Sequence, residues 1–487
     1  MRIYRVRVLT SLLKSGIPLN KADDLRELLE ENGYSLSSST HLRQMVPFVL
    51  HEEVQAIQRE MSGRPVSIIF DGTTHVAEAF VVVLRFVEDW CVKQRVSKLL
   101  LLVKSLTGKH VARLLVESLS TELGIASHLV IAAMHDRASV NAVAMHTVSV
   151  LYNRMFDFGC LSHTIDHVGE HLSLPVLNDF IKGWIGIFSH SPKMRLAWRT
   201  LTGLPPPSNS ATRWWSKFEV VNQVHDTFGD VTTFLNDHSI DLPAVSRGKL
   251  IHILNDAAKL RKLKMELAIT VDAMKPFVCA TYDLEGDGSL ALTAYQHISK
   301  LHSTIACEHY PNVVALAKRE SNGNSTHEQQ LIRYAKGCVQ PAYEYFRAKL
   351  DSLSGELKDI VLVFKAARYF VPSKLNELKP TATDIESLKL FPFFDASFIS
   401  QLKAELPAYV AAAEDVSPGF EMLSWWRHHQ NEMPTWAKAF QLLLLVQPSS
   451  AAAERVFSLL QNSFSQQQQS FLEDYISVSV MLQYNRK

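Results

Sequence analysis

The chain has 487 residues, about three times the usual domain length, so we expect several folding units or one large interrupted domain. A hydrophobic fraction of 47% and a charged fraction of 20% exclude a disordered or collagen-like protein, and 50 basic against 49 acidic residues exclude a whole-chain field that would gather nucleic acid or anionic membrane. The five cysteines show no CxxC spacing and no apolar run approaches the roughly 20 residues of a membrane span, so we expect a soluble protein of a reducing compartment.

The first 60 residues are typical of short helices, with Leu25, Leu28 and Leu29 spaced for one helical face. Three strand-like runs follow at 66–71, 79–87 and 96–106, each rich in Val, Leu or Ile. Their close spacing predicts an antiparallel meander.

The next stretch alternates helices and strands. The spacing predicts a helix over 111–123 that stops at Gly124, an apolar strand over 128–134, a second helix over 140–151 and a short strand over 156–160. This order predicts an α/β fold, in which helices pack on a mixed sheet and the fourth strand lies parallel to an earlier one.

Helical patterns dominate after about residue 175. Breaks at 204–207, 285–288 and 321–324 interrupt them, and the strand signal fades. We therefore expect a large helical region that follows the strands of the sheet in the sequence.

Two aspartates close strands of the predicted sheet. Asp71 ends the first strand and Asp136 follows the fourth, so both emerge at one edge if these strands are neighbours. Two close carboxylates repel unless a cation neutralises them, which makes the pair a natural ligand set for Mg²⁺ or Mn²⁺. The alternative is that each aspartate caps a turn or the following helix.

A third carboxylate stands near the C-terminus. Ser450 is a good N-cap and is followed by three alanines, so Glu454 lies early in a helix. The alternative for Glu454 is a solvated first-turn residue that complements the helix dipole.

Two further motifs carry chemistry. Cys160, His163, His167 and His171 recur at helical spacing and suit Zn²⁺, although half-buried histidines of a helix are commoner. The segment 212–216 places an arginine beside two tryptophans, a pattern that suits phosphate contact and base stacking, although tryptophan pairs are more often core. Around it, residues 182–264 hold twelve Lys or Arg against six Asp or Glu, which is either a phosphate-binding face or an ordinary helical surface.

In combination, these motifs resemble those of the transposases of the hAT superfamily and of host proteins derived from them. FDGTT at 70–74 and HDRASVN at 135–141 are similar to the segments of the first two catalytic aspartates, and CLSH at 160–163 to the Cys-x-x-His element. TRW at 212–214 is similar to the Arg-Trp motif, and SAAAERVFS at 450–458 to the C-terminal signature that holds the catalytic glutamate. The resemblance covers about residues 60–487, and the last motif is the most specific.

The resemblance implies a ribonuclease-H-like mixed sheet interrupted by a large all-helical insertion. We accordingly expect an N-terminal helical segment at 1–60, the first part of the catalytic domain at 61–216, the insertion at 217–430, and C-terminal helices with the hAT dimerisation region at 431–487.

The resemblance also implies a nuclear protein that forms a homodimer or larger homo-oligomer and cuts and joins DNA strands, without a membrane partner. Two Mg²⁺ or Mn²⁺ ions would be held by the catalytic residues Asp71, Asp136 and Glu454. DNA would be bound beside them by residues of the two remaining motifs, namely Cys160, His163, Arg213 and Trp214.

The sequence departs from the family pattern at three places. Thr73 and Thr74 stand where a tryptophan is usual, no Cys/His set before residue 60 could build the family's zinc finger, and Gln466 to Gln469 replace a basic stretch. Two alternatives to an active transposase therefore stay open. One is a domesticated nuclear protein that binds DNA and dimerises without cutting; the other is a zinc-dependent hydrolase built on Cys160, His163 and His167.

Overall fold

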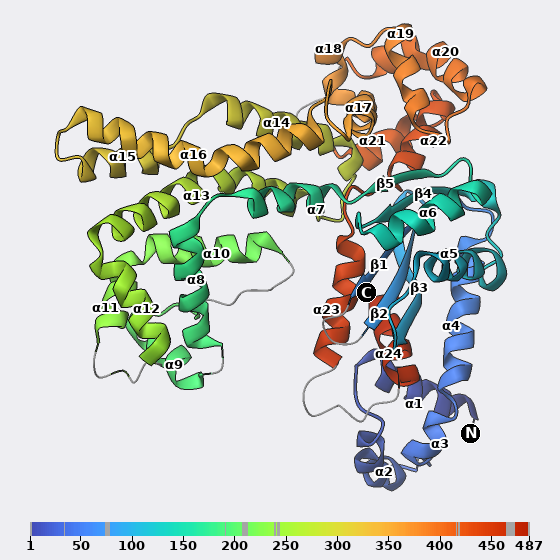
Figure 1. Ribbon diagram of the computed structural model, residues 1–487. Helices are drawn as coiled ribbons and strands as arrows, with labels where there is room; N and C mark the ends of the chain where they lie inside the picture. Colours follow the sequence, from blue (N-terminus) through green and yellow to red (C-terminus); the bar gives the residue numbers. More distant parts are fainter. Residues whose placement is uncertain are drawn as a thin grey trace. The chain divides into compact units, whose positions relative to one another are not determined.

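The structure is a computed structural model that describes residues 2–33, 35–73, 78–189, 191–206, 213–237, 240, 244–414, 416, 419–463 and 473–485. It is 69% helical and holds one mixed five-stranded sheet, so the predicted α/β class is confirmed. The chain divides into two compact units (Figure 1). The sheet unit comprises Met1–Leu161, Glu285–Ala294 and Leu362–Lys487, and the helical unit comprises Ser162–Leu284 and Tyr295–Val361.

The sheet has the strand order β3-β2-β1-β4-β5. Its strands are β1 (Val66–Thr73), β2 (Glu78–Glu88), β3 (Cys91–Leu102), β4 (Val130–His135) and β5 (Phe156–Gly159). The first three strands pair antiparallel, whereas β4 pairs parallel with β1 and β5 parallel with β4. The predicted meander and the predicted parallel return of the fourth strand are therefore confirmed. All six residues of β4 are buried, as expected for a strand covered on both faces.

One face of the sheet is covered by α4 (Val46–Met61), α5 (Gly108–Val116) and α6 (Ser139–Leu151). Thr107 caps α5 by accepting a hydrogen bond from the His110 amide, and the helix passes into a π-helical turn at Glu117–Glu122. A Cβ atom at Gly108 would come within 2.6 Å of the Val143 side chain, so the glycine permits the close approach of α5 and α6. The two predicted helices are present.

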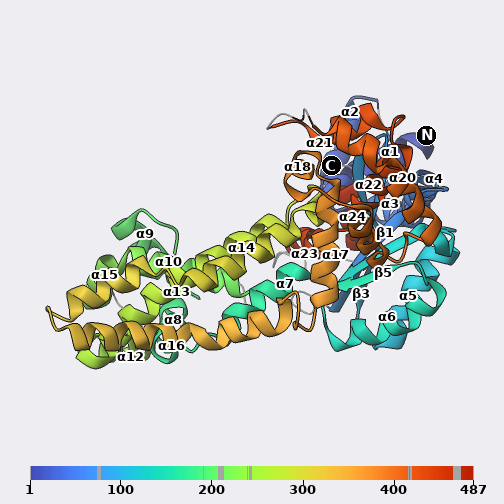
Figure 2. The ribbon, with the colours of Figure 1, turned by 90° about the horizontal axis from the view of Figure 1, so that it is seen from above.

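The opposite face of the sheet is covered by the last two helices (Figure 2). α23 (Ala451–Ser463) contacts β1 and β2, and α24 (Glu473–Asn485) contacts β3. Ser67 of β1 donates a hydrogen bond of 2.7 Å to the Leu445 carbonyl, which ties the segment before α23 to the centre of the sheet.

α24 also lies against α1 (Arg2–Lys14) and α4, and it shares a second hydrophobic core with the N-terminal helices α2 (Lys21–Glu31) and α3 (Ser39–Arg43). The helix is buried on nearly all sides, and it joins the N-terminal segment to the edge of the sheet. The predicted apolar face of α2 is largely outward, since Leu25 and Leu28 are exposed while Leu29 packs against this second core.

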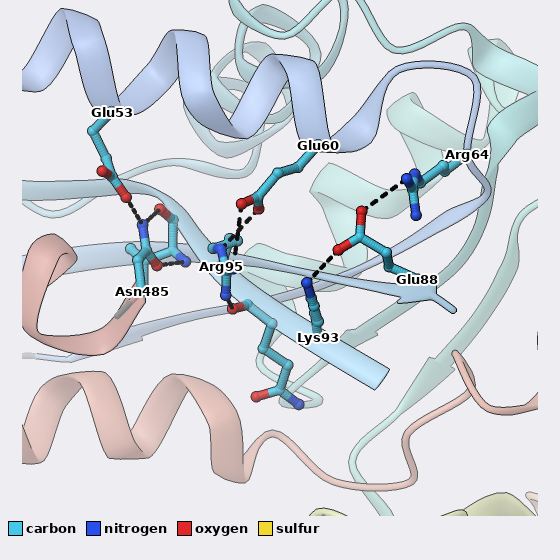
Figure 3. Close-up of polar contacts among 9 residues, drawn as sticks. Glu53, Glu60, Arg64, Glu88, Lys93, Arg95 and Asn485 are labelled. Atoms are coloured by element: carbon cyan, nitrogen blue, oxygen red, sulfur yellow. Dashed lines mark hydrogen bonds and ion pairs between the residues drawn. The ribbon is translucent and has the colours of Figure 1, made fainter. Parts of the chain in front are cut away.

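Asn485 seals the edge strand β3. A register shift in β3 leaves Val96 beside α24, and the Asn485 side chain accepts from the Val96 N–H at 2.6 Å and donates to its carbonyl at 3.1 Å. The same amide donates to buried Glu53 of α4 at 2.9 Å (Figure 3). The unpaired N–H and carbonyl groups of an edge strand are a template for aggregation, and here the Asn485 side chain forms hydrogen bonds with both groups of Val96.

The remaining helices of the sheet unit contain the buried residues Tyr409, Trp426 and Trp436, and the Tyr409 ring contacts both indole rings. In this part of the chain the helices are α17 (Lys358–Ala367), which begins in the helical unit, α18 (Leu375–Leu378), α19 (Ala382–Ile385), α20 (Ala396–Ala412), α21 (Met422–His429) and α22 (Pro434–Leu443). Short 3₁₀ turns lie at Ser127–Leu129, Leu290–Leu292, Arg368–Phe370, Pro372–Lys374 and Glu386–Leu390.

The helical unit is built around the 28-residue helix α13 (Ala257–Leu284). Its other helices are α7 (Leu161–Asp166), α8 (Pro175–Phe188), α9 (Pro192–Thr202), α10 (Trp214–Asp226), α11 (Phe228–Asn236), α12 (Ala244–Asn255), α14 (Ala294–Cys307), α15 (Pro311–Glu320) and α16 (Ser325–Leu350), with a 3₁₀ turn at His167–His171. Trp184, Trp198 and Phe234 form an aromatic cluster between α8, α9 and α11.

The domain limits at residues 60, 216 and 430 stay predictions. The compact units have other limits, because the helical unit begins at Ser162 and the chain returns to the sheet unit over Glu285–Ala294. None of the helices in the described ranges has the length and hydropathy needed to cross a bilayer.

Candidate functional site

Asp71 and Asp136 occupy equivalent positions at one edge of the sheet. In the parallel pairing of β1 with β4, Ile69 is the partner of Met134, and each aspartate stands two residues further along its own chain. Parallel strands present their carboxyl ends at the same edge, and ligands of α/β sheets commonly bind there. The expectation that the first and fourth strands are neighbours is confirmed.

The edge is held by two aromatic rings that precede the aspartates. The Phe70 ring stacks on the His135 ring with centroids 5.2 Å apart. His135 is buried, and its Nε2 lies 2.9 Å from Oδ1 of Asp157 on β5. Asp71 itself is 7% exposed and accepts a 2.8 Å hydrogen bond from the Gly72 amide. The backbone before both aspartates is therefore fixed by packing across three strands.

Sequence reasoning missed His135 and Asp157. The only signal was a histidine at the end of an otherwise apolar run, directly before Asp136.

Asp136 is half-buried and closes the turn that precedes α6, whose N-cap is Ala138. Its Oδ1 accepts hydrogen bonds from the Ala138 amide at 3.2 Å and from the Asn141 side chain. The capping alternative for this aspartate is thus present in the structure. Capping engages one carboxylate oxygen, so it does not exclude a ligand role for the other.

Glu454 lies in the first turn of α23, which is linked to the same edge by Cys160. The Ser450 hydroxyl donates to Oε1 of Glu454 at 3.2 Å and to the Cys160 sulfur at 3.5 Å, and the Ser450 amide donates to that sulfur at 3.4 Å. The Cys160 amide in turn donates to the carbonyl of His135 at 2.8 Å. Glu454 therefore lies near the end of β4 rather than on a remote surface.

The three carboxylates offer the oxygen donors that Mg²⁺ and Mn²⁺ prefer, and their elements place them at one edge. Within the ranges that the structure describes, however, no three His, Cys, Asp or Glu side chains form a group that could hold a metal ion. The local hydrogen bonds of Asp136 and Glu454 account for the orientation of these two side chains.

The Cys-x-x-His motif spans the end of β5 and the helix α7. Cys160 is fully buried after β5 and serves as the sulfur acceptor for Ser450. His163 lies in α7 and stacks on His167 at 5.8 Å, whereas His171 stacks on Tyr345 at 4.0 Å. The helix changes to a 3₁₀ turn at His167, and the tighter winding ends the shared face that the spacing predicted.

Arg213 and Trp214 are buried in the helical unit, at 6% and 9% exposure. The Trp214 indole lies on Gly169, where a Cβ atom would come within 1.9 Å of the ring. Asp166 accepts hydrogen bonds of 3.0 Å from the amides of Trp214 and Trp215 and thereby caps α10. The tryptophan is core, as in the alternative named from sequence, and the DNA contact of both residues stays a prediction.

Some motif positions lie outside the described residues, namely Thr74, Thr212 and Gln466 to Gln469.

Comparison with protein families gave one match. Residues 405–485 match the hAT family C-terminal dimerisation region. The match begins within α20, includes Glu454 and ends with α24, so it overlaps the edge described above. A search of curated proteins found no match. The resemblance inferred from the sequence motifs is confirmed by the family match.

Proposed function

Since the match to the dimerisation region supports a hAT-type transposase or a protein derived from one, we propose that the chain cleaves and joins DNA strands at the edge that carries Asp71, Asp136 and Glu454. One observation carries the proposal: the two aspartates stand at matching positions of neighbouring parallel strands, and α23 brings the glutamate to their side of the sheet. The dimerisation region supports homo-oligomerisation. DNA as the substrate and the nucleus as the location are parts of the proposal.

The proposal includes a ribonuclease-H-like fold. Three antiparallel strands followed by two strands parallel to the first, with helices on both faces, support it. The helical unit between β5 and α23 supports the further proposal of a catalytic domain interrupted by a helical insertion.

Asp71, Asp136 and Glu454 would hold the divalent ions. Bound Mg²⁺ or Mn²⁺ supplies a Lewis acid that activates an attacking oxygen and neutralises charge on the scissile phosphate. The chain's own part is to place the carboxylates: the stacked Phe70 and His135 rings fix the backbone before both aspartates, and Ser450 orients Glu454.

Arg137 offers a cation beside these carboxylates. A Cβ atom at Gly159 would come within 2.4 Å of the Arg137 side chain, so this side chain lies across the end of β5, next to Asp136. A guanidinium at this position suits the phosphate of a bound strand.

The experiment is strand nicking by the purified full-length chain with Mn²⁺ and labelled duplex DNA. Glu454→Gln should abolish nicking, because the amide keeps the hydrogen bond from Ser450 but loses the charge that binds a cation. Glu117→Gln, which changes an exposed carboxylate of the same unit, is the matched control and should leave nicking intact. Equal nicking by Glu454→Gln and the unaltered chain would reject the assignment.

A second candidate is a dimerising protein that does not cut DNA. It is favoured by the local hydrogen bonds of Asp136 and Glu454, which give both residues a structural role without any metal. Light scattering and Mn²⁺ titration separate the two candidates: the second requires oligomers that survive Asp71→Asn and an absence of Mn²⁺-dependent nicking with any DNA tested.

A further inference from the structure

A cleft of about 640 Å³ lies on the α23 side of the sheet, within the sheet unit and away from the edge that carries the aspartates. Its volume is within the roughly 300–1,000 Å³ usual for small-ligand sites. Its lining comes from β2, β3, the loop after α13, α23 and α24, and comprises Arg85, Val92, Lys93, Gln94, Arg95, Asp287, Arg455 and Tyr484. Four of these residues are cationic and one is anionic.

Two of the cations are neutralised on the far face of the sheet. Lys93 pairs with Glu88, and Arg95 pairs with Glu60 of α4 at 2.9 Å, as Figure 3 shows. Neither carboxylate lines the cleft. Strand residues alternate between faces, so Gln94 between these two cations is directed toward the cleft, beside its register partner Arg85.

Arg85 is a buried cation that makes no direct ion pair among the described residues, although Asp287 favours its charge from a greater distance. It is 1% exposed, and its guanidinium donates to two carbonyls, those of Leu444 at 2.8 Å and Gly288 at 3.2 Å. Burial lowers the pKa of Arg85 to about 10; Asp287 and Tyr484 oppose this shift, and nearby Arg455 adds to it. A guanidinium carries five N–H donors, and a buried charge is costly without a counter-ion, so an anion that enters the cleft meets a cation with spare donors.

Arg455 is the second donor at this cleft, and its present partner is replaceable. It pairs with Asp287 at 2.6 Å, but the Asp287 side chain is 74% exposed and the Arg455 side chain 39% exposed. Exposed ion pairs contribute little, because water and salt screen them. Gln94 and Tyr484 complete the lining with neutral polar groups, and the Tyr484 hydroxyl donates to Gln94 at 2.7 Å.

We infer that this cleft binds a phosphate group, which Arg85 and Arg455 hold in place of Asp287. A phosphate offers several acceptor oxygens to two guanidinium groups and neutralises both. The phosphate is either part of a small free anion or part of a nucleic-acid backbone. The site is separate from the carboxylate edge, so its failure and a failure of strand cleavage are distinguishable.

The test is binding by the full chain of two probes, sodium pyrophosphate by calorimetry and a labelled 20-nucleotide duplex by fluorescence anisotropy. Arg455→Gln should weaken binding about tenfold, the effect of one charge-assisted hydrogen bond. Asp287→Asn should tighten binding about two- to fivefold, because it removes the competing carboxylate and leaves the cations. The opposite signs of these two effects keep the test informative even if one variant is less stable.

Arg64→Gln is the matched control. Arg64 pairs with Glu88 at 2.8 Å near the cleft but does not line it, so its loss changes the net charge without changing the site. A response of both probes to the cleft variants supports a site for free phosphate, and a response of the duplex alone supports a site for backbone phosphate. Binding of neither probe, or equal losses in Arg64→Gln and Arg455→Gln, would overturn the inference.

Discussion

The edge of the sheet and the start of α10 contain motifs that resemble parts of the same family pattern, yet their surroundings in the structure differ. Asp71 lies two residues before the end of β1 and Asp136 directly follows β4, and the parallel register of the two strands brings both to one edge. Arg213 and Trp214 stand at a helix start that is packed against the turn at His167–His171 and capped by Asp166. A sequence motif therefore marks a position in the chain, whereas the packing around that position determines whether the side chain is accessible to a ligand.

The largest effect that tests this comparison is expected at Trp214. Trp214→Ala should lower the free energy of unfolding by about 3–5 kcal/mol, because it empties a core position that contacts Gly169. Urea unfolding followed by far-ultraviolet circular dichroism measures it. Trp215→Ala, which removes a half-buried indole from the same helix, is the control and should cost less. If Trp214→Ala lowers the free energy of unfolding no more than Trp215→Ala does, Trp214 is not a core residue and a role in contacting DNA is favoured instead.

A smaller effect is expected where the dimerisation region meets the sheet. Asn485→Ala should lower stability by about 1–3 kcal/mol, because it leaves the Val96 N–H and carbonyl and the Glu53 carboxylate without this partner. Gln483→Ala on the same helix removes one hydrogen bond, to Ser479, and should cost less. Thermal melting of both variants measures the difference. Equal melting temperatures would show that the edge of β3 does not depend on this side chain.

The sheet could be predicted from sequence because its central strands are mostly apolar, with few polar residues such as Ser67 and Arg85. β3 was the exception: the run at 96–106 was recognised, but the strand begins at Cys91. Lys93 and Arg95 concealed its first half, because an edge strand alternates polar and apolar residues and places charge on a solvated side.

The two aspartates of the site could also be predicted, because strand order fixes where strand ends meet. The contacts that hold the site could not. Cys160 and Ser450 are 290 residues apart, and no local pattern indicates that a buried cysteine joins α23 to the sheet. The predicted common face of His163, His167 and His171 is interrupted for a local reason: the helix tightens to a 3₁₀ turn at His167, which residue spacing alone cannot show.

A pH-dependent effect distinguishes the units, because the helical unit contains a buried carboxylate, Glu266, whose hydrogen bonds come from neutral donors and whose nearby cation Lys262 offsets the burial only in part. Glu266 accepts hydrogen bonds from Tyr334 and from the Leu177 amide, and burial raises its pKa. A raised pKa in the folded state means that the native chain binds more protons, so this contribution to stability is full below the unfolded pKa and is lost as pH rises through the folded value. Glu266→Gln should therefore flatten the decline in stability with rising pH.

The measurement for Glu266 is the free energy of unfolding at several pH values from 4 to 8. Glu320→Gln, which changes a carboxylate paired with Lys264, is the control and should keep the decline. An unchanged pH profile in Glu266→Gln would show that water reaches this carboxylate in solution.

The smallest effect on stability is expected at Asp136, and it separates the two roles of this residue. An Asn side chain forms the same turn as Asp, so Asp136→Asn should retain the hydrogen bond from the Ala138 amide and change stability by less than about 0.5 kcal/mol. The same variant loses the charge that a divalent ion requires, and Mn²⁺ affinity should fall at least about tenfold, as even outer-shell changes commonly cause. Calorimetric titration and thermal melting of one preparation give both numbers. If Mn²⁺ affinity and stability are both unchanged, the turn before α6 alone accounts for Asp136, and the carboxylate edge then has a structural role in this chain without metal-dependent chemistry.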